Sequence, residues 1–194
     1  VAGRFLELRP GSAEALGLVG DIELLMGQGA PALERYAASA KVRFNDQLAL
    51  RSALALERAG RGGQAPELVS RYLALFPGSR LMTRIAANQA LAAQDWGRAR
   101  LLLESLRQRG GNRDAGLLAD LSLAQLRSGD AEAALQTAQR VWQIAPASPF
   151  AALTRAMALS ALGRDPDMAR QLVDQVSKTA PGNPLLAEAR RKLR

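Results

Sequence analysis

The sequence predicts an all-α fold in which antiparallel helix pairs repeat along the chain. Apolar residues make up 48% of the 194 residues, and most of them are Ala and Leu, which favour helices. Aromatic residues, which favour strands, make up only 4%. In addition, an alanine recurs every 33 to 35 residues, at positions 32, 65, 99, 134 and 169.

The residues around each of these alanines define a unit of two helices. Turn residues that can end a first helix come five residues earlier, at Gly27, Gly60, Gln94, Gly129 and Arg164, which directly follows Gly163. Mostly small residues come twelve residues earlier, at Gly20, Ala53, Ala87, Ser122 and the exception Met157. Two helices approach closely only where side chains are small, so we predict that Ala134 is fully buried where the helices of the fourth unit cross.

Each unit should end at a helix-stopping residue. Pro77, Pro146 and Pro181 fit this rule, and Asp114, Ser148 and Asn183 are expected to cap or nearly cap the helices that follow them. We expect helix pairs at 13–26 and 30–43, 47–59 and 64–76, 80–93 and 96–109, 114–128 and 131–145, and 149–162 and 166–179, with a last helix at 184–193.

Three segments depart from the repeat. The first unit ends in Phe44-Asn45-Asp46, the third ends in Gly110-Gly111-Asn112, and the second has Arg61-Gly62-Gly63 between its helices. We expect these units, and the fifth with its Met157, to pack loosely or to tilt the stack.

The pattern resembles the tetratricopeptide repeat family, most clearly in SLAQLRSGDAEAALQTAQRVWQIAP, which ends at Pro146, and in ANQALAAQDWGRARLLLESL, which ends at Leu106. The resemblance implies a right-handed superhelical solenoid whose first helices line an inner groove. It also implies a non-enzymatic scaffold that binds a peptide or a partner helix in that groove.

The resemblance covers nearly the whole chain as a single array. We expect a half repeat at 1–12, repeats at 13–45, 46–79, 80–114, 115–149 and 150–183, and a C-terminal helix at 184–194. The chain does not begin with Met, and Val1 to Arg9 reads as the tail of a helix already under way. We therefore expect a fragment of a longer protein. No apolar stretch approaches the roughly 20 residues needed to span a bilayer.

The groove should be lined by first-helix residues that point away from the second helix. These are Glu14, Gly17, Asp21, Gln47, Leu50, Leu54, Arg84, Asn88, Ala119, Leu123, Thr154 and Ala158. Some family members hold a C-terminal carboxylate with basic and Asn residues on three successive first helices. Carried over to this chain, that clamp falls on Arg84, Asn88, Asp120, Ala151 and Arg155. Asp120 would repel a carboxylate and Ala151 lacks a cation, so we expect a broken clamp.

Composition argues against catalysis and for binding. The chain has no Cys and no His, which excludes disulfides, thiol nucleophiles, histidine acid–base chemistry and the usual zinc sites. Acidic residues at helix starts, such as Asp95, Asp165 and Asp167, are expected to serve as caps, and Trp96 and Trp142 to pack in the core. We expect no catalytic residue, cofactor or metal site.

The net charge of +8 leaves two interpretations open. In the first interpretation, the arginines are solvated on helix faces and have no special role. In the second, the chain is a basic adaptor for an acidic polymer, either nucleic acid or an anionic polysaccharide. Aromatic residues do not alternate with the arginines, so a nucleic acid is the less favoured polymer. The composition is weakly similar to that of bacterial envelope proteins tied to polysaccharide secretion or exosortase-dependent sorting, which favours the envelope slightly over the cytoplasm.

The two ends of the array should differ. Leu185, Leu186, Ala189 and Leu193 give the last helix one apolar side, as in a capping helix. At the N-terminus, we expect Phe5 or Leu8 to pack on the first repeat. We also expect an apolar strip near Ala2 and Leu6 to stay uncovered and to cause weak self-association.

Overall fold

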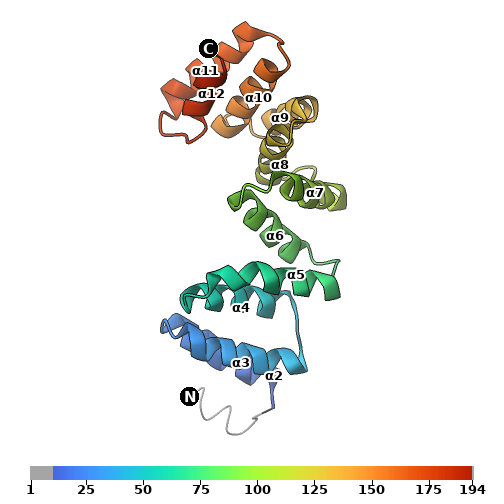
Figure 1. Cartoon of the computed structure of the whole chain (residues 1–194), viewed down its shortest axis with the longest axis vertical. Coiled ribbons are helices and arrows are strands. Elements are labelled where there is room, and N and C mark those ends of the chain that lie inside the picture. The colour runs from blue at the N-terminus through green and yellow to red at the C-terminus, as the bar shows by residue number, and fades with distance from the viewer. Residues whose placement is uncertain (1–10, 194) are drawn as a thin grey trace. The chain divides into compact units, whose positions relative to one another are not determined.

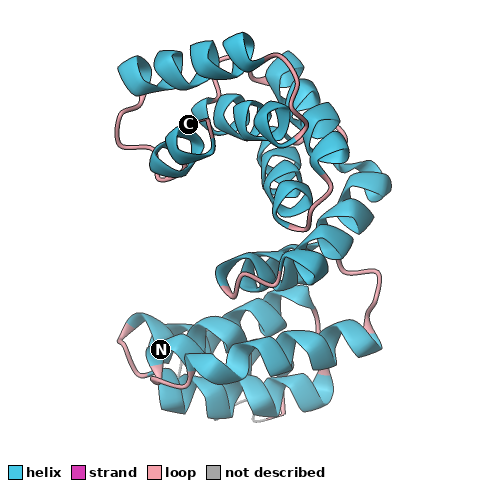
Figure 2. Cartoon of the chain, turned by 45° about the horizontal axis from the view of Figure 1, so that its top comes forward, coloured by secondary structure: helices cyan, strands magenta, loops and turns pink. Residues whose placement is uncertain are grey.

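The structure, a computed structural model, describes residues 11–193 and consists there of helices joined by short turns, with no strand (Figures 1 and 2). Its helices are α2 (Ala13–Leu25), α3 (Gly29–Val42), α4 (Asp46–Arg58), α5 (Ala65–Leu75), α6 (Arg80–Ala92), α7 (Trp96–Leu106), α8 (Ala115–Arg127), α9 (Ala131–Ile144), α10 (Pro149–Ala161), α11 (Pro166–Thr179) and α12 (Leu186–Lys192). The chain divides into two compact units, residues 1–86 and 87–194. The predicted all-α, tetratricopeptide-like fold is confirmed.

The helices begin and end close to the predicted residues. The clearest difference is at the end of α7, where the α-helix stops at Leu106 and a π-helical turn runs from Arg107 to Gly111. Gly110 has a φ of 104° there, and a Cβ atom on Gly111 would lie 2.9 Å from the carbonyl oxygen of Leu106. The two glycines therefore permit a tight turn that the repeat pattern alone does not predict.

The turns inside the helix pairs follow the sequence prediction. Gly27, Gly60, Gln94, Gly129 and Gly163 all have a positive φ, between 56° and 88°. Gln94 takes this conformation although it has a side chain. The left-handed turn is thus a property of the repeat position as well as of glycine.

Small residues mark the helix crossings, as predicted. Ala32, Ala99, Ala134 and Ala169 have no exposed surface, and Ala65 is 4% exposed. Met157, the one large residue at a position where a small one is expected, is also fully buried. It lies in the core formed by α8 to α12, so its bulk fills space there, and the expectation of loose packing in this unit is wrong.

The unusual end of the first repeat is held by aromatic contacts, which argue against loose packing there. The ring of Phe44 lies edge-on to Tyr72 at 4.8 Å between centroids, and Tyr72 lies 4.7 Å from Phe76. Asn45 caps α4 by accepting a hydrogen bond from the amide of Leu48 at 3.0 Å. The aromatic contacts and the cap do here what proline does at the ends of other units.

Side-chain caps fix several other helix starts. The side chains of Asp95, Asp114, Ser148 and Asp165 each accept a hydrogen bond from the amide three residues later, and Asn183 accepts one from the amide of Leu185.

The second compact unit ends with α12, whose Leu186 and Ala189 are buried against α10 and α11. The predictions for Phe5, Leu8, Ala2 and Leu6 fall outside the described residues. None of the described helices combines the length and the apolar character that a membrane span requires.

Candidate functional site

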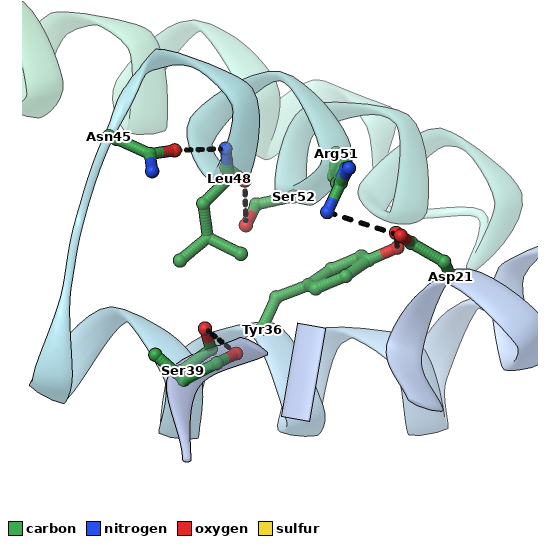
Figure 3. Close-up of polar contacts among 8 residues, drawn as sticks. Asp21, Tyr36, Ser39, Asn45, Leu48, Arg51 and Ser52 are labelled. Carbon is green, nitrogen blue, oxygen red and sulfur yellow. Dashed lines mark hydrogen bonds and ion pairs between the residues drawn. The ribbon is translucent and has the colours of Figure 1, made fainter. Parts of the chain in front are cut away.

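The first compact unit, residues 1–86, contains two repeats, and an ion pair joins their first helices, α2 and α4. Asp21 of α2 accepts a hydrogen bond from the hydroxyl of Tyr36 at 2.8 Å. Its other carboxylate oxygen lies 3.1 Å from Nη1 of Arg51 on α4. Figure 3 shows the three side chains converging on one point. The Asp21 and Arg51 side chains are 30% and 39% exposed, so the pair can be reached from solvent.

The burial of Tyr36 against Gly20 directs its hydroxyl toward the carboxylate of Asp21. Tyr36 is 1% exposed, and its ring lies so close to Gly20 that a Cβ there would be 2.7 Å from a ring carbon. Burial, and then the hydrogen bond with Asp21, raise the pKa of Tyr36 well above its usual value. The tyrosine therefore stays a donor at all ordinary pH values and fixes the carboxylate.

Exposed leucines flank this ion pair. Leu18 precedes Asp21 by one helical turn and is 48% exposed, and Leu54 follows Arg51 by one turn and is 44% exposed. Residues three apart on a helix share a face, so both leucines lie beside the pair. We call Leu18, Asp21, Gln47, Leu50, Arg51 and Leu54 the first-helix surface. Among them Gln47 is exposed and Leu50 half-buried.

The remaining predicted groove residues divide into accessible and inaccessible ones. Asn88 and Glu14 are exposed, and Arg84, Ala119, Asp120, Leu123 and Arg155 are half-buried. Thr154 and Ala158 are fully buried and Gly17 is buried, so none of these three can line a groove, and that prediction is wrong for them. The reason for Thr154 and Ala158 is that α10 packs against α8, α9, α11 and α12, which leaves little of its surface free.

The expected break in the carboxylate clamp gains one structural detail. Ala151, where the family pattern asks for a cation, is 1% exposed. It lacks both the charge and the access that a contact with a ligand requires. Arg155 has a buried Nε atom without a hydrogen-bond partner among the described residues.

Sequence reasoning missed two hollows on the second helices. One of about 830 Å³ lies between α3 and α5, with Ser52 and Leu56 of α4 at its floor. Another of about 560 Å³ lies between α7 and α9, with Leu118 and Gln125 of α8 at its floor. The two occupy the same place in their repeats. The sequence signal was available, since Ala30, Ala37 and Ala40 leave α3 with an apolar side that the helix crossings do not need.

The hollow between α7 and α9 is crossed by polar contacts. Arg100 of α7 lies 3.5 Å from the carboxylate of Asp130, the N-cap of α9. Arg107 forms a bidentate ion pair with Glu104, which lowers the pKa of Glu104. Arg140 donates to the carbonyl of Asn112 at 3.2 Å. The contacts of Arg100 and Arg140 join the two sides of this hollow, whereas the Arg107–Glu104 pair stays on the α7 side.

The tryptophans are only partly in the core. Trp96 is half-buried, with the Arg127 guanidinium 5.4 Å from its ring centroid, and Arg127 also forms an ion pair with Glu188 of α12. Trp142 is half-buried against the core of α8 to α12. Both serve packing, although neither is enclosed. Within residues 11–193, no group of acidic side chains is arranged to hold a metal ion.

Comparison with known proteins agrees with this architecture. Residues 125–193 match the sequence profile of the tetratricopeptide repeat family. No curated protein sequence matches the chain.

Solved structures match over most of the chain. A structure described as "YrrB: a TPR protein with an unusual peptide-binding site" superposes with a TM-score of 0.78 at 12% identity, covering 98% of both chains. A tetratricopeptide repeat protein from Parabacteroides merdae gives a TM-score of 0.76 at 16% identity, covering 93% of this chain and 72% of its own. MamA AMB-1 gives 0.70 at 17% identity, covering 89% and 94%. The chain therefore has the fold of tetratricopeptide repeat proteins, and its residues 125–193 also match that family by sequence.

Proposed function

We propose that this chain binds a peptide or a helix of a partner protein on its first-helix surface. The family and the fold support a protein-interaction scaffold in general. YrrB, which is similar in fold, is described as having a peptide-binding site, and this favours a peptide as the ligand.

The observation that carries the proposal is the fixed ion pair between two exposed leucines. Tyr36 holds Asp21, and Asp21 holds Arg51, so the polar centre is ordered before a partner arrives. Such preorganisation lowers the entropy cost of binding. Leu18 and Leu54 offer apolar contact on either side, and the remaining lone pairs and N–H groups of the ion pair can bond to a peptide backbone.

Asn88, Leu123 and Arg155, on first helices of the second compact unit, are separate candidates for contacts with a partner. Asp120 belongs to the same first helix as Leu123, and its carboxylate would repel a free C-terminus. We therefore propose that a segment bound beside Leu123 is internal to the partner or blocked at its end. An amidated peptide should accordingly bind at least as well as the same peptide with a free carboxylate.

Partner capture with matched variants tests the proposal. Leu54→Arg places a charge in the centre of the proposed contact, whereas Ala74→Arg places the same charge on an exposed position of α5. The partner should be captured by the unchanged chain and by Ala74→Arg, and lost or reduced about tenfold in affinity with Leu54→Arg. Equal capture by both variants, each shown to be folded by its circular dichroism, would refute the proposal.

The net charge of +8 favours a second candidate, a basic adaptor for an acidic polymer. Several arginines that could serve it are already paired with acids, including Arg35 with Glu23 and Arg164 with Glu132. Because these pairs neutralise part of the basic surface, we rank this candidate second.

A further inference from the structure

The hollow between α3 and α5 is an open groove of about 830 Å³. Both helices pack on α4, and the floor between them is formed by α4. We call this hollow, lined by residues of α3, α4 and α5, the second-helix cleft.

Apolar side chains line the cleft at helical spacing. On α3 and just after it, Leu33, Ala37, Ala40 and Phe44 follow one another at intervals of three or four residues. On α5, Leu68 and Leu75 face the same space, and Leu75 is 68% exposed. The alanines let another helix approach closely, while the larger residues give it apolar contacts. This is the lining that suits an amphipathic helix.

The charges on the rim are sorted along the cleft. Glu34 and Glu67 lie nearer the N-terminal ends of α3 and α5, and Lys41 and Arg71 lie nearer the C-terminal ends. These four side chains are exposed, and none forms an ion pair with another residue that the structure describes. Arg61 also lines the acidic end, where it donates to Gln64 at 2.8 Å.

The helix dipoles do not account for this order. A dipole attracts charges only within the first or last turn. Glu67 lies in the first turn of α5 and Lys41 in the last turn of α3, but Glu34 and Arg71 lie outside those turns. Arg71 follows Glu67 by four residues on α5, which is the spacing of a stabilising pair on a helix. Of the four charges, Glu34 is therefore the one that neither the dipoles nor this spacing explains.

We propose that the second-helix cleft binds an amphipathic helix of a partner protein, antiparallel to α3 and α5. An acidic residue in its first turn would meet Lys41 and Arg71, and a basic residue in its last turn would meet Glu34 and Glu67. Since Glu34 and Lys41 are seven residues apart, these two ligand charges lie about 10 Å apart, or two helical turns. Acid first and base last is also the order that stabilises the ligand's own helix.

The equivalent hollow of the second compact unit has a polar lining where the second-helix cleft is apolar. Where α3 has Leu33 and Ala37, the equivalent positions of α7 are Arg100 and Glu104, and where α4 has Leu56, α8 has Gln125. The charged pair Arg100–Asp130 spans that hollow. The proposal therefore applies to the second-helix cleft of the first unit alone.

A selection experiment tests this proposal. A displayed library of helical peptides is selected on the full chain, and each enriched peptide is measured against two variants. Ala37→Trp fills the cleft, and Ala74→Trp makes the same change on an exposed part of α5 outside it. Peptides of the expected kind should lose about tenfold or more in affinity with Ala37→Trp and change less than about twofold with Ala74→Trp. They should also carry acids near the start and bases near the end.

Exchanging the charged ends of an enriched peptide tests its direction. The exchanged peptide should bind more weakly at low salt, and the difference should shrink at high salt because the rim charges are exposed. The proposal fails if no peptide is enriched, or if the enriched peptides bind Ala37→Trp as well as the unchanged chain. Equal binding of both charge orders would overturn the antiparallel placement. Leu54→Arg should leave these peptides unaffected, which separates this site from the first-helix surface.

Discussion

The ring of Tyr36 on α3 lies directly against the backbone of Gly20 on α2. A Cβ atom at position 20 would fall 2.7 Å and 2.9 Å from two ring carbons, closer than van der Waals contact allows. The absence of a side chain at Gly20 is thus what lets Tyr36 reach Asp21. The close approach of two helices in the first repeat and the geometry of its exposed ion pair depend on the same glycine.

Gly20→Ala should therefore destabilise the chain, although alanine favours helices. We expect a loss of about 1–3 kcal/mol in the free energy of unfolding, because the tyrosine ring must move. Gly97→Ala is the matched control, since a Cβ there would contact only a carboxylate oxygen at 4.0 Å; its stability should be unchanged or slightly higher. Denaturant unfolding measures both. Equal stability of the two variants would contradict the described packing.

Ala134→Phe tests the repeat register in the second unit. Ala134 has no exposed surface, so a phenyl ring there should overpack the crossing of α8 and α9 and cost about 1–3 kcal/mol or more. Gln139→Phe adds the same ring at an exposed position of α9 and should change stability little. If thermal unfolding of Ala134→Phe matches that of the control, the register of the five repeats is wrong.

Both tyrosines of the chain should resist ionisation in the folded state. Burial and the bond to Asp21 raise the pKa of Tyr36, and burial and the bond to Asp46 raise the pKa of Tyr72 to about 12. An unfolded tyrosine titrates near pH 10, so the folded state holds these protons more tightly. The resulting stabilisation is fully present below about pH 10 and is lost as the pH rises through the folded pKa values.

Tyrosinate absorbance measures this directly. In guanidinium the absorbance should rise near pH 10, and in the folded chain it should rise only at clearly higher pH or together with alkaline unfolding. Tyr72→Phe leaves Tyr36 as the single reporter. A folded chain that titrates like the denatured one would show that these hydroxyls are not buried.

Salt dependence distinguishes the two candidate functions. If arginines bind an acidic polymer, the affinity should fall steeply and linearly on a logarithmic salt scale. A peptide held by Leu18 and Leu54 around an internal ion pair should lose much less. Binding of an anionic polysaccharide that survives physiological salt, with no measurable binding of the selected or captured peptides, would reverse our ranking.

The fold was predictable because the repeat has a simple physical cause. Ala32, Ala99, Ala134 and Ala169 recur because helices cross closely there, and this spacing also locates the turns. What the pattern does not encode is how a unit ends without proline. The ring cluster of Phe44, Tyr72 and Phe76 joins residues from two neighbouring repeats. Such contacts can be identified only from the structure in which the repeats pack together.

The site was less predictable than the fold. The first-helix pattern placed Asp21, Leu50 and Leu54 at positions that solvent reaches, and their role in binding stays a prediction. A helical position alone did not reveal that α10 packs against four other helices and that Thr154 and Ala158 are buried. The ion pair of Arg51 with Asp21 joins two repeats, so no single repeat predicts it. The second-helix cleft was not predictable because the repeat spacing marks the helix crossings and assigns no role to alanines such as Ala30 and Ala37, which lie outside them.

The most direct test of a scaffold that binds through its first helices is site-specific photo-crosslinking. A photoreactive residue is placed at Leu54, and a second chain carries it at Ala74 of α5; Ala37 in the second-helix cleft serves as a third, independent position. We predict that a partner is crosslinked from Leu54 and not from Ala74. A partner crosslinked equally from both positions, or from neither while the chain is shown to be partner-bound, would contradict binding on the first-helix surface.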